Sequence, residues 1–263
     1  TNVKTSGALT VGAGSSSISG GLIVGAATSS VTSAVLEASS TTKGFLPPRM
    51  SGSQRDAISS KVAGLVVWCS SCGNNGELQV YNGTTWTNII GGTASPAFEV
   101  GMAYQGGIIA YILQSGDPGY DANVKHGLIA ATSDQNPGII WGPYSTTGAT
   151  GATGTAIGTG STNTDAIILS QGNSYSYAAK LCADYSVTLN SVVYDDWYLP
   201  SKDELRLVFN AKSSIGGFSG YGDYWSSSEK SSTSAFVQEF YGSGSTAYTG
   251  KDARFRVRAI RSF

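Results

Sequence analysis

Three cysteines and one histidine are the residues of this sequence with the most specific chemistry. Cys69 and Cys72 stand in the segment WCSSCG, Cys182 stands apart, and His126 is the only histidine among 263 residues. A tetrahedral zinc site made of Cys and His would need all four. We expect instead a disulfide between Cys69 and Cys72 at the tip of a hairpin. Free thiols, a metal site and a redox pair are the alternatives, although no thioredoxin-like βαβ pattern surrounds the pair.

No set of residues indicates catalysis. A Ser-His-Asp triad would have to use His126, but the sequence has no G-x-S-x-G turn, and HGLIAAT reads as the start of a strand. Asp195, Asp196, Asp203 and Glu204 are close in sequence and are the type of ligand that calcium prefers. Asp203 and Glu204 have a simpler role at the start of a helix. We therefore expect no catalytic residue, cofactor or metal, with calcium as the alternative.

The charge of the chain is nearly balanced but unevenly distributed. Lys and Arg number 16 against 17 Asp and Glu, so nucleic acid and anionic membranes are not expected as partners. No apolar run approaches the roughly 18 residues of a membrane-spanning helix. Positive charge gathers near the carboxyl end, in Lys251, Arg254, Arg256, Arg258 and Arg261.

The segment RFRVRAIRSF (254–263) alternates arginines with apolar residues, which predicts a final strand with one basic face. Such a face could bind sulfated or carboxylated glycans through bidentate contacts. The alternative is that the arginines pair with carboxylates inside the fold, for which the candidates are Asp223, Glu229 and Glu239.

Hydrophobic patterns predict the elements that position these residues. In LPSKDELRLVFNAK, Ser201 and Glu204 form a capping box, and Leu205, Val208 and Phe209 line one helical face. The segment SYAAKLCADY (176–185) predicts a second helix with a buried cysteine. Strands are expected in GGIIAYIL (106–113) and HGLIAAT (126–132), and a long Gly/Thr loop over 143–166. These elements indicate an α+β fold.

Composition divides the chain into four parts. Residues 1–40 contain short apolar pairs with the near-repeat LTVGA and LIVGA, typical of a β-rich fibre segment that orders only by association, and a homotrimer is expected. A flexible Gly/Ser linker is the alternative. Residues 41–92, the collar module, predict a short helix in SGSQRDAIS and strands in GLVVWC and ELQVYN. Residues 93–100 predict a hinge, and residues 101–263 a globular domain.

Residues 101–263 resemble the Lcl C-terminal domain family. The resemblance rests on the order GGIIAYIL, HGLIAA, DDWYLPSKDELRLV, YWSSSE and VRAIRSF. It implies a C-type lectin-like fold, with paired first and last strands and two helices. The calcium motifs of sugar-binding lectins are absent, and the cysteine pair of the formylglycine-generating enzymes is absent because only Cys182 lies in the domain. Upstream, TTKGFLPPRM and WCSSCG resemble the stalk or collar of phage tail fibres and surface adhesins.

The carboxyl end is also similar to variable proteins of diversity-generating retroelements, whose mutagenised window would run here from Lys230 to Arg256. Adenine-directed change cannot produce Lys, Gln or Glu at AAC codons, so Lys230, Gln238, Glu239 and Lys251 would be fixed or differently encoded. An ordinary surface loop is the alternative. The candidate ligand-binding positions are Thr233, Tyr241, Ser243, Thr246, Tyr248, Asp252, Arg254 and Phe255.

The sequence therefore predicts an extracellular, non-enzymatic fibre protein, on a phage tail or a bacterial surface. Its carboxyl-terminal domain would bind a cell-surface glycan or protein, because Tyr, Ser and Gly are the residues that binding loops favour. The alternative is a structural fibre subunit whose terminal domain caps and registers the assembly.

Overall fold

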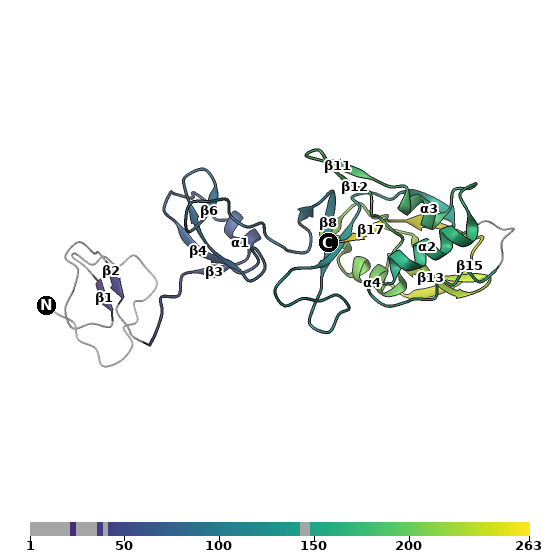
Figure 1. The fold of residues 1–263 in the computed structure, drawn as a ribbon, viewed down its shortest axis with the longest axis horizontal. Coiled ribbons are helices and arrows are strands. Elements are labelled where there is room, and N and C mark those ends of the chain that lie inside the picture. Colours follow the sequence, from purple (N-terminus) through teal and green to yellow (C-terminus); the bar gives the residue numbers. More distant parts are fainter. Residues whose placement is uncertain (1–21, 25–35, 39–41, 143–147) are drawn as a thin grey trace. The chain divides into compact units, whose positions relative to one another are not determined.

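The computed structural model describes residues 22–24, 36–38, 42–142 and 148–263 (Figure 1). The chain divides into two units, Thr1–Pro47 and Pro48–Phe263. In the first unit, β1 (Leu22–Val24) pairs in parallel with β2 (Leu36–Ala38). The rest of the predicted fibre segment, residues 1–40, lies outside the described residues. The predicted boundaries at residues 40, 92 and 100 stay predictions.

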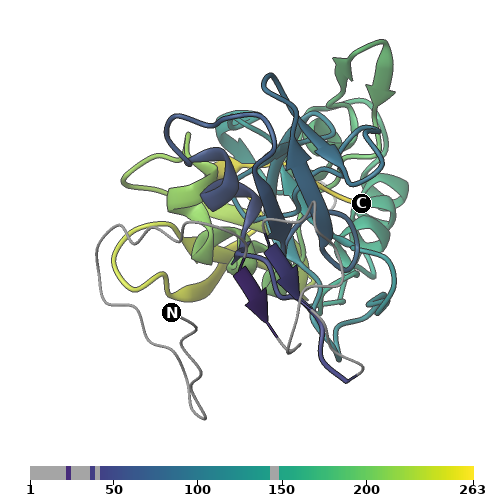
Figure 2. The same ribbon diagram turned by 90° about the vertical axis from the view of Figure 1, so that its left-hand side faces the viewer.

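The collar module contains a small sheet with the order β3-β4-β5-β6. The strands are β3 (Arg49–Met50), β4 (Val66–Cys69), β5 (Glu77–Tyr81) and β6 (Trp86–Asn88). The helix α1 (Gly52–Asp56) lies beside this sheet (Figure 2). It begins with a capping box in which Ser51 and Gln54 bond reciprocally. The predicted short helix and both predicted strands are confirmed.

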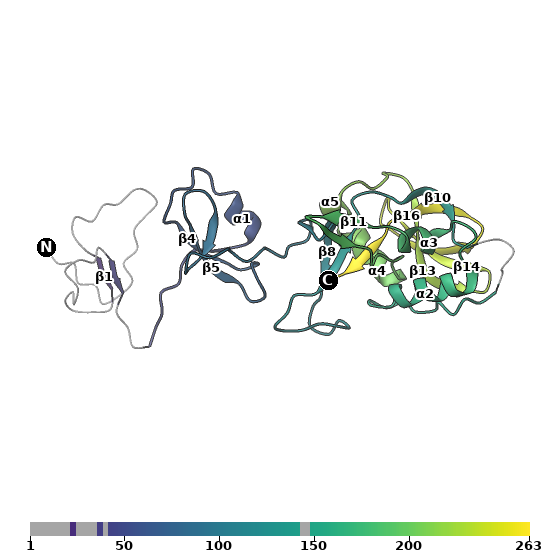
Figure 3. The same cartoon turned by 45° about the horizontal axis from the view of Figure 1, so that its top comes forward.

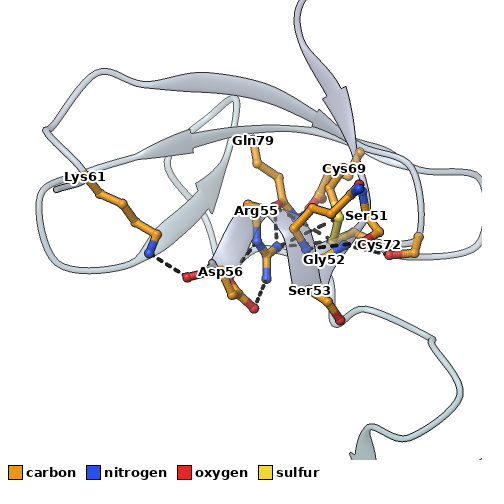
Figure 4. A network of polar contacts seen from close by, with 12 residues as sticks. Ser51, Gly52, Ser53, Arg55, Asp56, Lys61, Cys69, Cys72 and Gln79 are labelled. Carbon is orange, nitrogen blue, oxygen red and sulfur yellow. Dashed lines mark hydrogen bonds and ion pairs between the residues drawn. A yellow bond between two sulfur atoms is a disulfide. The ribbon is translucent and has the colours of Figure 1, made fainter. Parts of the chain in front are cut away.

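A buried polar cluster takes the place of a large apolar core in the collar module. Cys69 and Cys72 form a disulfide, and both are fully buried. The buried Arg55 guanidinium donates to Gln79 and lies 3.1 Å from the Cys72 sulfur, as Figure 4 shows. It also forms an ion pair with Asp56. A covalent link and a bonded network suit a module too small for a large hydrophobic core.

Residues 93–100, for which we predict a hinge, are bonded to the collar module. Ala97 forms a bridge with Cys72, and the Phe98 amide donates to the Ser71 carbonyl. The Glu99 carboxylate accepts hydrogen bonds from Ser53 and Ser71. These contacts order the segment along the collar module.

Two sheets form the framework of the carboxyl-terminal domain, with the orders β17-β9-β8-β7 and β10-β16-β13-β14-β15. The first contains β7 (Ala103–Tyr104), β8 (Gly107–Ile112), β9 (Gly127–Ala130) and β17 (Ile260–Ser262). The second contains β10 (Asn136–Ile140), β13 (Asp223–Ser231), β14 (Ser234–Glu239), β15 (Thr246–Gly250) and β16 (Arg254–Val257). A separate hairpin is formed by β11 (Val187–Leu189) and β12 (Val192–Tyr194).

Four helices accompany these sheets in the described residues: α2 (Gly160–Gln171), α3 (Ala178–Ala183), α4 (Lys202–Asn210) and α5 (Lys212–Ile215). The helix α2 packs against β13, and α4 packs against β13, β14 and β8 (Figure 3). The predicted α+β class is confirmed. The predicted capping box of α4 is present, and Leu205, Val208 and Phe209 are buried. The predicted helix around Cys182 is also present, and burial raises the pKa of that thiol.

The helix α2 was not predicted, since its first half falls in the expected Gly/Thr loop at 143–166. Its buried positions include Gly160, Asn163 and Thr164, whereas Leu169 is 89% exposed. A helix that buries polar residues and exposes an apolar one lacks the apolar periodicity used for prediction. Hydrogen bonds satisfy the buried polar groups. The Asn163 amide donates to the Gly154 carbonyl, and the Thr164 hydroxyl accepts from the Leu199 amide.

The predicted single strand over residues 254–263 is wrong. The segment forms two strands, β16 and β17, in different sheets, and Arg258 and Ala259 connect them. The last strand, β17, pairs with β9. The lectin-like resemblance implies pairing of the first and last strands, but here β9 separates β17 from β8.

Candidate binding groove

Seven of the eight predicted binding residues are exposed, and Phe255 is the exception. The Phe255 ring packs edge-on against the buried Trp225 at a centroid distance of 5.0 Å, so it serves the core. The exposed residues do not converge on one point. Thr233 lies in the turn between β13 and β14, while Tyr241 and Ser243 lie in the turn between β14 and β15, at the opposite end of β14.

The outer strand β15 carries two of the predicted residues. Thr246 bonds through its hydroxyl to Gln238, and Tyr248 is 61% exposed. The Lys230 ammonium lies 5.8 Å from the centre of the Tyr248 ring. Asp252, which precedes β16, and Arg254, the first residue of β16, are both exposed. These residues are accessible, and whether they bind a ligand stays a prediction.

The predicted basic surface does not form, because most of its cations pair inside the fold. Lys251 forms a buried ion pair with Glu229 at 2.8 Å, and Arg261 pairs with Asp196. Arg256 and Arg258 both pair with Asp134. Of these carboxylate partners, Glu229 is a sequence-based candidate, whereas Asp134 and Asp196 are found only in the structure. These cations are held by carboxylates of the fold, which argues against a polyanion-binding face.

Arg258 holds the loop 216–222 in place. Its guanidinium is fully buried, bonds Asp134 at 2.8 Å, and donates to the carbonyl oxygens of Ala131 and Gly217. It also lies 3.9 Å from the centre of the Phe218 ring. Gly217 has a φ of +70°, and a Cβ there would lie 2.6 Å from the Thr132 carbonyl oxygen. The loop is thus fixed by a buried cation and by close backbone packing.

This loop forms one wall of an open groove of about 550 Å³. The helix α5 and the turn after β14 complete the groove. Tyr221 is 87% exposed and Tyr241 is 39% exposed, so two phenol rings line an accessible surface. Lys212 orders the wall by donating to the Phe240 carbonyl at 3.0 Å. The lining residues are Lys212, Ser213, Gly216, Gly217, Phe218, Ser219, Gly220, Tyr221, Phe240, Tyr241 and Gly242.

Tyr241 is the one predicted binding residue in this groove. The sequence pattern missed the wall formed by residues 216–222, although the composition GGFSGYG resembles the binding loops that supported the choice of Tyr241. The ordering role of Arg258 could not be predicted, because its partner Asp134 lies 124 residues away.

A second, smaller cavity of about 210 Å³ contains His126 and Ser262. The Ser262 hydroxyl bonds to the Tyr198 hydroxyl at 2.8 Å, and the His126 Nδ1 lies 3.0 Å from the Phe263 carbonyl oxygen. Burial raises the pKa of the nearby Glu204, although hydrogen bonds from Ser201 and the Gly158 amide oppose this. The polar groups of His126 and Ser262 therefore already have hydrogen-bond partners within the domain.

Three of the four carboxylates considered for calcium have other partners or roles. Asp196 pairs with Arg261, Asp203 with Lys202, and Glu204 caps α4. Within the described residues, no group of three or more His, Cys, Asp and Glu could hold a metal ion. No described helix is long and apolar enough to cross a membrane.

Comparison with known proteins finds a family match in the amino-terminal part of the chain. No curated protein matches. The solved structure of a fimbrial protein from Bacteroides ovatus ATCC 8483 shares 14% identity with a TM-score of 0.42. The alignment covers 64% of this chain and 46% of the fimbrial protein, so the chain spans less than half of that protein's length. Residues 24–100 match the family described as phage tail like trimerisation region, in agreement with the predicted resemblance to a fibre stalk.

Proposed function

We propose that this chain is a subunit of an extracellular homotrimeric fibre whose carboxyl-terminal domain binds a receptor on a cell surface. The observation that carries the proposal is the match of residues 24–100 to a phage tail-like trimerisation region. The domain would act by non-covalent binding, without turnover. The C-type lectin-like fold and the diversified window are further parts of this proposal, and they rest on the sequence resemblance.

Exposed apolar side chains in the matched region support assembly. Val62 is 63% exposed, Ile89 60% and Ile90 88%. Burying apolar area stabilises association by about 25 cal/mol per Å², so such side chains favour contact between subunits. A trimer also explains how a collar module with a small core is stabilised.

The groove between residues 216–222 and 240–242 supports receptor binding. It presents the exposed rings of Tyr221 and Tyr241 among glycines and serines. Tyrosine supplies a large contact area at low entropic cost, and Gly and Ser allow close approach. The proposed site therefore extends the predicted residue Tyr241 to the neighbouring loop.

Replacing Tyr221 by alanine should weaken receptor binding about 30-fold, because a central aromatic residue commonly contributes about 2 kcal/mol to an interface. The measurement is the affinity of the intact chain for immobilised cells or for arrayed surface glycans and proteins. The matched control is Tyr175→Ala, since Tyr175 is 65% exposed but lies outside the groove.

Equal weakening by the two substitutions would contradict a binding site in the groove. Absence of binding to every cell, glycan and protein tested, with intact trimers, would favour the alternative in which the domain caps and registers the fibre. Both variants are surface changes, so each should keep the melting temperature of the parent chain.

A further inference from the structure

The small sheet of the collar module has one covered face. Side chains alternate between the two faces of a strand, and directly paired residues of neighbouring strands share a face. Val67 of β4 pairs with Gln79 of β5, and both are buried. The Arg55 guanidinium of α1 donates to Gln79, as Figure 4 shows, and the Ser95 amide donates to Glu77, which lies on the same face as Gln79. The helix α1 and the chain around Ser95 therefore cover this face.

The opposite face, which we call the open collar face, is apolar at its centre. Val66 pairs with Val80, and Trp68 pairs with Leu78. None of these four side chains is buried, and Val66 is 38% exposed. The loop at Gly76 approaches the Trp68 ring, since an added Cβ there would lie 2.9 Å from it. The register of the sheet assigns to the open collar face Arg49, Val66, Trp68, Leu78, Val80 and Thr87.

The distribution of polar and apolar side chains is the reverse of that in a solitary sheet. A sheet with one face in solvent ordinarily buries its apolar side chains and exposes its polar ones. The strand β5 buries Gln79 instead and leaves Leu78 and Val80 partly exposed. The buried apolar cluster described for this module contains no residue of the open collar face, and its members are Cys69, Cys72 and Ala97, with Met102 packed against them. A second layer over the open collar face would give the module a larger hydrophobic core.

A second copy of the chain fits this face by its charge. The four central side chains are uncharged, and Arg49 lies on β3 at the edge of the sheet. Such a face can meet a copy of itself without burying an unpaired ion at the centre. The face also lies within residues 24–100, which match the phage tail-like trimerisation region.

The size of the open collar face shows that further contacts belong to the same interface. Strands lie about 4.8 Å apart and rise about 3.4 Å per residue, so four short strands present a face of roughly 15 Å by 15 Å. A stable interface buries about 800 Å² on each partner. Ile89 and Ile90 directly follow β6 and are 60% and 88% exposed, so they can extend the contact beyond the sheet.

We propose that the open collar faces of three copies pack against one another around a threefold axis, with Trp68, Leu78 and Val80 in the shared core. The inference rests on the proposed homotrimeric function and names the surface through which the subunits bind. It explains why the collar module buries a polar network on one face and leaves apolar side chains on the other.

The first test replaces Leu78 by aspartate in the intact chain, which would place three carboxylates in the shared core. At a concentration where the parent chain is trimeric, light scattering should give the mass of a single chain, 27.1 kDa. The matched control is Leu169→Asp, because Leu169 is 89% exposed on α2 and lies outside the collar module. It should stay trimeric, and so should Leu78→Met, which keeps an apolar side chain of similar volume.

The second test uses cross-linking, because Leu78→Asp could also unfold the collar module. The variant Thr87→Cys adds one thiol to the open collar face, and a short bismaleimide should join copies into covalent dimers on a denaturing gel. The control is Ala57→Cys, at the exposed end of α1 on the covered side of the sheet, which should give no more dimer than the parent chain. The free thiol of Cys182 is buried and should contribute little background.

A monomeric Leu78→Asp chain beside a trimeric Leu169→Asp chain, with cross-links at Thr87→Cys, supports the inference. Equal masses for the two Asp variants, or equal cross-linking of the two Cys variants, would overturn it. If both Asp variants stay trimeric, the homotrimer stands and the open collar face is covered by another segment of the same chain. A monomeric parent chain would overturn both the inference and the proposed trimer.

Discussion

Replacing Arg258 by leucine should lower the free energy of unfolding of the carboxyl-terminal domain by about 3–5 kcal/mol. The Arg258 guanidinium is fully buried and bonds Asp134. Its removal leaves that carboxylate with the contact to Arg256 at 3.2 Å and the hydrogen bond from the Tyr224 hydroxyl at 2.9 Å. Removing one partner of a buried ion pair costs more than the pair itself contributes, because a charge stays buried. Urea unfolding followed by tryptophan fluorescence measures the loss.

The control for Arg258 is Arg254→Leu, on the same segment. Arg254 is exposed, and its substitution should change the free energy of unfolding by less than about 0.5 kcal/mol. The Arg258 variant should also bind receptor less well, because Arg258 fixes the loop that forms one wall of the groove. Similar stability losses in the two variants would contradict the assigned role of Arg258.

Replacing Lys251 by methionine should cost about 3–5 kcal/mol at neutral pH. The Lys251 ammonium bonds the buried Glu229 carboxylate, which also accepts hydrogen bonds from the amide and hydroxyl of Thr150. Without Lys251, the Glu229 charge stays buried with too few donors. The double variant Lys251→Met/Glu229→Gln should recover more than half of the loss, whereas Lys230→Met, at an exposed lysine, should change stability little.

The stability loss of the Lys251→Met variant should depend on pH in one direction. Burial alone would raise the pKa of Glu229, but the bonds from Lys251 and Thr150 outweigh it and lower the pKa. The ionised Glu229 carboxylate therefore stabilises the parent chain, and this stabilisation is lost as pH falls through the lowered pKa. In the Lys251 variant the pKa of Glu229 should rise above its unfolded value. The penalty should then be largest at neutral pH and shrink as pH falls toward 4.5. A penalty independent of pH would contradict this assignment.

Local patterns in the sequence predicted the local parts of the fold. The helix α1 is predicted by the serine caps of SGSQRDAIS, and α4 by the capping box of Ser201 with Glu204, because both signals lie within a few residues of the helix start. The helix α2 was missed because its buried Asn163 and its neighbours gain their partners from distant segments. The final strand was misjudged for a related reason, since burial of Arg258 depends on Asp134.

The candidate site was predictable only in part. The content of Tyr, Ser and Gly in residues 240–244 indicated Tyr241, which does line the groove. The opposite wall depends on contacts that no local pattern contains, such as the Lys212 bond to the Phe240 carbonyl.

The proposed function requires this chain to form a trimer. The most direct measurement is the molar mass of the intact chain in solution, by light scattering coupled to size exclusion. The chain has a mass of 27.1 kDa, so we expect a species of three times that mass, about 81 kDa. Replacing the exposed Ile89 and Ile90 with Asp should shift this species toward single chains. A stable 27.1 kDa monomer at every concentration would contradict a trimeric fibre subunit.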